Sequence, residues 1–209
     1  MTSPHSQRRI ALLLWLLCAQ AGLAATVTVS VASRAGNALA DTVIVFDPLD
    51  ANPAPSRDTA VIDQINKHFV PRVSVVRTGT TVTFPNSDHI RHQVYSFSAP
   101  KQINLKLYAG SPETPIVFDR PGLIVLGCNI HDSMVGFVGV VDSPYFGKTA
   151  GSGTVALNLP AGRYRLRAWN PNALAAVAAR EITIGAVPLS IPLTLDLDNE
   201  SANVAAWPE

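Results

Sequence analysis

Three side chains that can bind a metal ion lie within one short segment of the chain. Cys128, His131 and Met134 follow one another at three-residue steps, between Gly127 and Gly136. A thiolate, an imidazole and a thioether together form the ligand set of a mononuclear electron-transfer copper site. Such a site also needs a second histidine from another strand and a rigid frame. The segment therefore predicts one copper ion held by a β-sheet scaffold.

The second histidine is expected to be His92. It follows the loop 86–91 and opens the strand-like segment 93–97. His89 is the alternative because it lies in the same loop. His68 has no partner in the pattern and is interpreted as a solvated or capping residue.

The first 24 residues have the composition of a secretory signal peptide. Arg8 and Arg9 precede a leucine-rich apolar run, and small residues stand at Gly22 and Ala24. We expect cleavage after Ala24 and a periplasmic or secreted mature chain, without stable insertion in the membrane. An uncleaved anchor and a twin-arginine export signal are the alternatives, but the run is short for a membrane span.

The 209-residue chain has two cysteines and two methionines, and cleavage would remove Met1 and Cys18. Cys128 and Met134 would then be the only sulfur-containing side chains of the mature protein. A single cysteine in an oxidising compartment cannot form an internal disulfide, so another group should occupy the thiol. Loss of Arg8 and Arg9 also leaves 14 of the 16 basic residues against 15 acidic ones. This near-neutral charge argues against nucleic acid or anionic lipid as a partner.

The mature chain reads as short strands almost throughout. Hydrophobic residues make up 47% of the sequence and charged residues 15%, which is enough apolar material for a packed core. Apolar and polar residues alternate in 26–31, 103–108 and 189–197. Turn signals recur at intervals of about 8–12 residues, as in antiparallel sandwiches. These features predict an all-β fold, and residues 173–179 are the only helix candidate.

Two segments divide the chain, a proline-rich one at 47–58 and a glycine-rich one at 142–153. We expect residues 60–143 to form one domain. Two strands before residue 50 are too few to bury a face alone. Residues 25–50 and 150–199 are therefore predicted to form a second, small β-sandwich together. The alternative is that these flanks add strands to one larger sandwich.

Residues 60–143 resemble the cupredoxins, in particular the plastocyanin and amicyanin group. Those proteins have an asparagine, five residues and the ligand histidine, as Asn86 and His92 do here. Amicyanin ends with Cys-x2-His-x2-Met, which Cys128, His131 and Met134 fit. The resemblance implies a Greek-key β-sandwich and one copper ion, with His92, Cys128 and His131 as equatorial ligands and Met134 as the axial one. It also implies an electron carrier that serves a redox partner protein, rather than an enzyme.

The chain is most similar to secreted cupredoxin-like proteins labelled methylamine utilization proteins. Their characteristic runs are nearly intact in four segments of this sequence: 93–98, 107–110, 118–119 and 127–134. Gln93 stands where those proteins often have a second histidine, and Arg91 stands where plastocyanin and amicyanin have proline. Both differences concern the redox potential and leave the ligand set intact.

The flanks resemble a different family. Segments 35–43 and 159–164 are similar to the carboxypeptidase regulatory-like domain, a transthyretin-like β-sandwich. Within 163–167, arginines alternate with apolar residues, so they share one strand face. This row is interpreted as a solvated face, with a docking face as the alternative.

Several neighbours of the ligands have expected roles. The ring edge of His131 should reach the surface, where Ile130 and Val135 would form an apolar patch for a redox partner. Asn86, Asp132 and Gln93 are expected to orient the ligand loops through hydrogen bonds. Each residue type is also common in ordinary turns or strands.

Other interpretations of the same residues remain open. One is a copper-delivery protein without electron transfer, in which Asp132 and His89 assist an exposed ion. Another is a thiol enzyme with Cys128 as the nucleophile, although this leaves Met134 unexplained. Cys128 could be a small buried hydrophobe and Met134 a core residue. Zinc could also occupy a Cys-His-His group.

Overall fold

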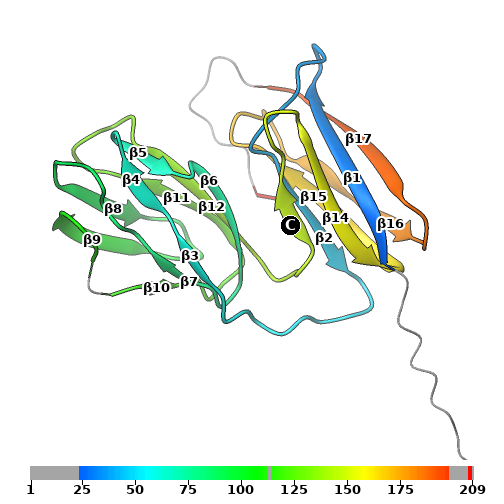
Figure 1. The fold of residues 1–209 in the computed structure, drawn as a ribbon, viewed down its shortest axis with the longest axis horizontal. Helices are drawn as coiled ribbons and strands as arrows, with labels where there is room; N and C mark the ends of the chain where they lie inside the picture. Colours follow the sequence, from blue (N-terminus) through cyan, green and yellow to red (C-terminus); the bar gives the residue numbers. More distant parts are fainter. Residues whose placement is uncertain (1–23, 113, 198–206, 209) are drawn as a thin grey trace, which may run out of the picture.

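The structure is a computed structural model that describes residues 24–112, 114–197 and 207–208. These residues form strands and connecting loops, with no helix among them. The predicted all-β fold is therefore confirmed. Figure 1 shows two groups of strands side by side, β3 to β12 in one and β1, β2 and β14 to β17 in the other.

The first group is called the central sandwich. One of its sheets has the order β6-β12-β11-β8-β9, and the layer facing it contains the sheet β10-β7-β3 and the hairpin β4-β5. A buried apolar core that includes Phe69, Phe84, Phe118 and Leu126 fills the space between the layers. The strands are β3 (Thr59–Val61), β4 (Asp63–Ile65), β5 (His68–Val70), β6 (Val73–Arg77), β7 (Thr81–Thr83), β8 (His92–Ser96), β9 (Ile103–Tyr108), β10 (Ile116–Val117), β11 (Gly122–Gly127) and β12 (Val135–Val141).

The second group is called the flank sandwich. Its outer sheet has the order β14-β1-β17, and its inner sheet the order β13-β2-β15-β16. The strand β1 runs antiparallel to β14 and parallel to β17, so an N-terminal strand lies between two C-terminal ones. The strands are β1 (Ala24–Ser33), β2 (Val43–Pro48), β13 (Phe146–Lys148), β14 (Thr154–Pro160), β15 (Gly162–Trp169), β16 (Val177–Ile184) and β17 (Leu189–Leu195).

The helix candidate at residues 173–179 is wrong. Ala173 forms an isolated bridge with Leu197, and Val177 begins β16, which pairs with β15. The alanines of this segment favour a helix by intrinsic propensity. Pairing with a long neighbouring strand outweighs that preference, which amounts to a few tenths of a kcal/mol per residue.

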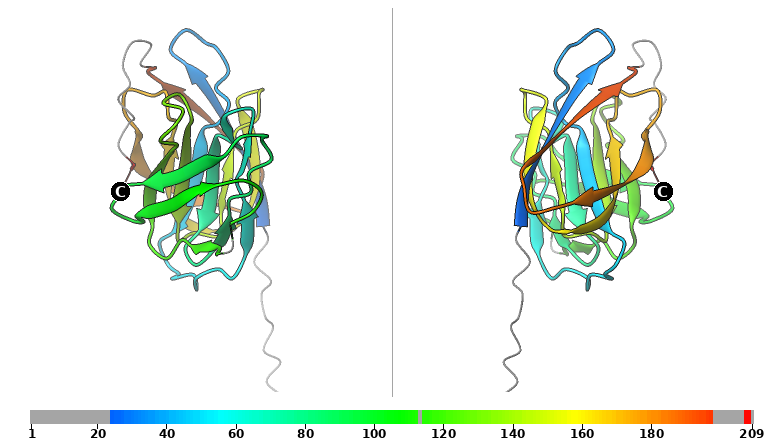
Figure 2. Two further views of the ribbon diagram at one scale, coloured as in Figure 1. Left: turned by 90° about the vertical axis from the view of Figure 1, so that its left-hand side faces the viewer. Right: turned by 90° about the vertical axis from the view of Figure 1, so that its right-hand side faces the viewer.

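Strand β12 joins the two sandwiches because both of its faces are covered. Val138 and Val140 belong to the core of the central sandwich, whereas Phe137 packs against the core of the flank sandwich. The Phe137 ring lies 5.7 Å from that of Trp169, and Trp169 lies 5.6 Å from Trp207. The side views of Figure 2 show one sandwich in front of the other.

The arginine row on β15 carries ion pairs with the end of β2 and the loop after it. Arg163 lies 2.6 Å from Asp50, and Arg167 lies 2.6 Å from Asp47. Pairing neutralises much of the charge that a docking face would use. In the described part of the chain, no helix has the length and apolar character of a membrane span. The expected signal peptide lies outside the described residues, except for its last residue.

Candidate metal centre

His92, Cys128 and His131 meet where β8 begins and β11 ends. Their ligand atoms all lie within 4.8 Å of one another. His92 Nδ1 is 3.7 Å from Cys128 Sγ, and the centroids of the two imidazole rings are 5.1 Å apart. Three side chains that the sequence singles out are therefore grouped around one point, although 36 residues separate His92 from Cys128.

The backbone brings these side chains together through the pairing of β8 with β11. Gly127, the last residue of β11, pairs with Tyr95 on β8. A Cβ atom at Gly127 would lie 2.6 Å from Cζ of Tyr95, so only glycine permits this approach without movement of the ring. The loop then turns at residues 131–134, where the Met134 amide donates to the His131 carbonyl at 2.9 Å.

The candidate ligand residues differ in their exposure to solvent. The exposed fractions are 0% for His92, 3% for Cys128 and 0% for Met134, whereas His131 is partly exposed. Met134 lies in the same apolar cluster as Cys128. His89 is exposed and outside the group, and so is His68, whose Nδ1 lies 2.8 Å from the Asn66 carbonyl.

The arrangement fits a single metal ion. His131 Nδ1 is buried and has no hydrogen-bond partner, an unfavourable state that a bound cation would relieve. Metal–nitrogen and metal–sulfur bonds of about 2.0 and 2.3 Å, separated by a trigonal angle of about 120°, place their donor atoms about 3.7 Å apart. His92 Nδ1 and Cys128 Sγ have this separation.

Asn86 holds the loop that leads to His92. Its Nδ2 donates to the carbonyls of Ile90 at 2.9 Å and Tyr108 at 2.8 Å, and its Oδ1 accepts from the Asp88 amide at 3.0 Å. Asn86 therefore makes the loop-orienting hydrogen bonds that the sequence predicts. Gln93 does not share this task, because its Nε2 donates to Asn104 at 2.9 Å across the β8–β9 pair.

A buried hydrogen-bond group beneath this loop adds support. The Tyr108 hydroxyl donates to the Phe84 carbonyl at 2.5 Å and accepts from Gln64 Nε2 at 2.5 Å. Burial raises the pKa of Tyr108 to about 12, although the bond from Gln64 acts in the opposite direction. The phenol therefore stays protonated near neutral pH and remains a donor.

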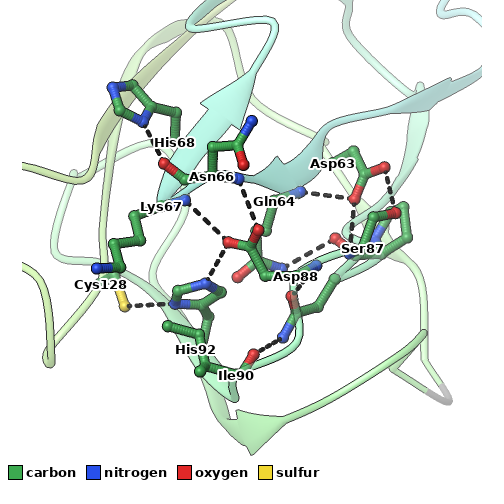
Figure 3. A network of polar contacts seen from close by, with 12 residues as sticks. Asp63, Gln64, Asn66, Lys67, His68, Ser87, Asp88, Ile90, His92 and Cys128 are labelled. Carbon is green, nitrogen blue, oxygen red and sulfur yellow. Dashed lines mark hydrogen bonds and ion pairs between the residues drawn. The ribbon is translucent and has the colours of Figure 1, made fainter.

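Asp88 is a functional candidate that was not predicted from the sequence. Its carboxylate lies 2.7 Å from His92 Nε2 and accepts the backbone amides of Asn66 and Lys67 (Figure 3). Burial raises the pKa of Asp88, but hydrogen bonds from Lys67, His92 and Asn66 outweigh it and hold the pKa below its ordinary value. The sequence did contain one indication of this role, because Asp88 stands four residues before a candidate ligand histidine. The second ring nitrogen of such a histidine needs a hydrogen-bond partner.

Comparison with known proteins gives structural likenesses to copper proteins. No protein-family model and no curated protein matches the chain. A Cu-containing nitrite reductase from Thermus scotoductus SA-01 is 24% identical, with a TM-score of 0.38 over 46% of this chain and 26% of that protein. A purple cupredoxin from Nitrosopumilus maritimus is 26% identical, with a TM-score of 0.34 over 40% of this chain and 99% of that protein.

A third structure, pseudoazurin from Methylobacterium extorquens AM1, is 18% identical, with a TM-score of 0.36 over 41% of this chain and 77% of that protein. The chain thus spans about a quarter of the nitrite reductase, and each likeness covers less than half of this chain. The function proposed below therefore rests on the side chains of the site.

Proposed function

We propose that the protein binds one copper ion through His92, Cys128 and His131, with Met134 as a weaker fourth ligand, and carries single electrons in the periplasm or outside the cell. The observation that carries this proposal is the convergence of two imidazoles and the thiol within 4.8 Å. Copper bound to such ligands supplies a one-electron step between Cu(II) and Cu(I). The protein's part is to keep the ligand positions alike in both states.

Burial of the ligands supports a carrier over a copper-delivery protein or an enzyme. Delivery requires an ion that other molecules can reach, whereas His92 and Cys128 are 0% and 3% exposed. A nucleophilic cysteine would likewise need access to a substrate. Met134 is an apolar, polarizable side chain that belongs to the same buried cluster as Cys128, which supports its proposed role as a weak fourth ligand.

The exposed edge of the site suits a redox partner protein. His131 is partly exposed, and the exposed large apolar side chains nearest the ligands in sequence are Ile130 and Ile90, which are 47% and 42% exposed. Val135 does not extend this patch as expected, because it is partly buried and packs against the flank sandwich. We propose that Ile130 and Ile90 surround the point where electrons enter and leave.

Copper spectroscopy tests the site. Purified protein loaded with Cu(II) should show an intense thiolate-to-copper absorption in the visible range that disappears on reduction. The Cys128→Ala variant should lack this absorption. The His89→Ala variant, which removes an exposed histidine three residues from His92, should keep it. A colourless Cu(II) form of the wild-type protein would contradict the proposal.

Electron self-exchange tests the proposed entry point. Ile130→Lys should slow exchange between oxidised and reduced copies, because a charge in the contact repels an identical copy, and should leave the absorption spectrum unchanged. Leu174→Lys is the matched control, since Leu174 is 60% exposed but lies in the flank sandwich. Equal rates for the two variants would place the entry point elsewhere.

A further inference from the structure

The Asp88 carboxylate lies between the His92 ring and the turn of the β4–β5 hairpin (Figure 3). Its Oδ2 is 2.7 Å from His92 Nε2 and 2.8 Å from the Lys67 amide, and its Oδ1 is 2.6 Å from the Asn66 amide. The Asp88 side chain is 13% exposed and that of His92 is fully buried. Three donors thus converge on one carboxylate in a place largely closed to water.

The hairpin turn holds this carboxylate independently of His92. Asn66 and Lys67 have φ angles of 53° and 62°, and they join the paired residues Ile65 and His68. This two-residue geometry with positive φ is that of a type I′ turn. Both turn amides donate to Asp88, so its position is fixed by backbone atoms of a different strand pair.

A second carboxylate attaches the same hairpin to the loop from the other side. Asp63 Oδ2 accepts the Ser87 hydroxyl at 2.7 Å, and Asp63 Oδ1 accepts the Ser87 amide at 3.2 Å. Asp63 therefore fixes the residue next to Asp88 without contacting a candidate ligand. The pair offers a natural comparison between a carboxylate that contacts His92 and one that only anchors the loop.

The contact with Asp88 determines which nitrogen of His92 faces the site. An ionised carboxylate only accepts hydrogen bonds, so Nε2 must carry the proton. Nδ1 of the neutral ring then presents its lone pair on the side of Cys128 Sγ, 3.7 Å away. Without the carboxylate, either nitrogen could be protonated, and a ring protonated at Nδ1 cannot bind a metal through that atom.

We propose that Asp88 is a positioning residue that fixes the tautomer and orientation of His92 and, through its negative charge, stabilises Cu(II) more than Cu(I). This inference rests on the proposed copper function. A carboxylate bonded to the far nitrogen of a ligand histidine makes the ring a stronger donor. The more highly charged ion gains more from that donor and from the nearby charge. Asp88 thus lowers the reduction potential of the site.

The test compares Asp88→Asn with Asp63→Asn in the full protein. Asp88→Asn keeps the shape of the side chain and should weaken Cu(II) binding by about 10–100-fold. Cu(I) binding should fall less. A loss that is about tenfold greater for Cu(II) than for Cu(I) raises the potential by about 59 mV. Asp63→Asn also removes one negative charge near the loop and should leave the potential close to that of the wild-type protein.

Comparison of the two variants with the wild-type protein distinguishes a failure of the role proposed for Asp88 from a failure of the proposed copper function. If the wild-type protein forms the thiolate-to-copper absorption but both variants have the wild-type potential, the role of Asp88 is refuted and the copper site stands. A shift of equal size in both variants also refutes it, because charge alone would then explain the effect. If the wild-type protein lacks the absorption, the proposed function itself fails.

A measurement on the unaltered protein covers the case in which Asp88→Asn does not fold. Nitrogen-15 NMR of the histidine rings distinguishes the two neutral tautomers in the metal-free and Cu(I) forms. His92 should carry its proton on Nε2 in both forms. A neutral His92 ring that carries its proton on Nδ1 in the metal-free protein would overturn the inference.

Discussion

Each sandwich contains a buried asparagine with the same set of hydrogen bonds. Asn86 is 4% exposed and Asn170 is 3% exposed. In both, Nδ2 donates to two acceptors and Oδ1 accepts the amide two residues later. Asn170 connects the end of β15 to residues 40–42 before β2. Asn86 connects the loop before His92 to β9, so the same arrangement supports a framework in one sandwich and a candidate ligand in the other.

The two sandwiches differ in the side chains that they bury. The flank sandwich buries a long apolar series that includes Trp169, Tyr164 and Phe46. The interior of the central sandwich also holds His92, Gln64 and the thiol of Cys128. A core that contains ligands has less apolar area to stabilise it. We therefore expect the flank sandwich, which packs against β12, to stabilise the central sandwich that holds the site.

The largest expected loss of stability comes from replacing Trp169, in the core of the flank sandwich. Replacing this fully buried ring with alanine should lower the free energy of unfolding by about 3–5 kcal/mol, because it leaves a cavity beside Phe137. Denaturant titration of the metal-free protein measures the loss. The copper absorption of the folded fraction should be unchanged. Phe97→Ala, at a residue 83% exposed, serves as the control and should be close to neutral.

The next largest effects are expected from replacing Asn86 and Asn170, and they differ in copper affinity. Asn86→Ala and Asn170→Ala should each lower the free energy of unfolding by about 1–3 kcal/mol, because each leaves buried acceptors without a donor. Only Asn86→Ala should also weaken Cu(II) binding, by about tenfold, since it releases the loop before His92. Titration with a competing chelator measures the affinity. Equal affinities in the two variants would show that the loop holds His92 without Asn86.

A smaller effect distinguishes two arginines of β15. Arg167 has a side chain only 13% exposed and donates two bonds to Asp47 and one to the Pro208 carbonyl. Arg167→Gln should cost roughly 1–3 kcal/mol of unfolding free energy. Arg163 is exposed and pairs with Asp50, so Arg163→Gln should have no measurable effect. Equal losses in denaturant titrations would mean that the burial of Arg167 is unimportant.

The smallest effect is a dependence of stability on acid. Hydrogen bonds from Arg163, Arg34 and Lys101 hold the pKa values of Asp50, Asp196 and Asp119 below the ordinary value. A lowered folded-state pKa stabilises the protein above the unfolded value near 4, and this contribution disappears as pH falls through the folded value.

Two of these three pairs lie in the flank sandwich and one in the central sandwich. The denaturant concentration at the unfolding midpoint should therefore stay nearly constant from pH 7 to about pH 4 and should decrease slightly between about pH 4 and pH 3. Asp50→Asn should reduce the fall, and added salt should reduce it further by screening the exposed pairs. A midpoint that rises on acidification would contradict the assignment.

The parts of the site that lie close together in sequence could be predicted. Cys128, His131 and Met134 share one loop, and their spacing alone indicates a metal site. His92 was separable from His89 because it opens an alternating strand. Asp88 was not identified, because its four-residue spacing to His92 is common in loops and the two amides that fix its carboxylate belong to a turn about twenty residues earlier. That turn, Asn66-Lys67, lacks glycine, so the polar segment 63–68 gave no sign of a hairpin.

Prediction of the fold from the sequence was limited in the same way, because only strands with a local pattern could be recognised. Strict alternation in residues 26–31 and 189–197 marked β1 and β17 correctly, because each has one face on the core. Residues 177–179, which were predicted as part of a helix, begin an edge strand that is mostly exposed, so no alternation distinguished them from a helix. Local composition decided that prediction, whereas pairing with β15 decides the structure.

The position of β1 between β14 and β17 has a consequence for biosynthesis. Residues 24–33 are synthesised before the other described strands, yet their partners begin only at Leu189 and Thr154. The strands of the central sandwich, in contrast, are contiguous from Thr59 to Val141. Contacts distant in sequence form late, and unpaired strand edges are prone to aggregate. The strand β1 is therefore synthesised well before its partners and is among the last to be paired, and a chaperone that shields it should raise the yield of folded protein.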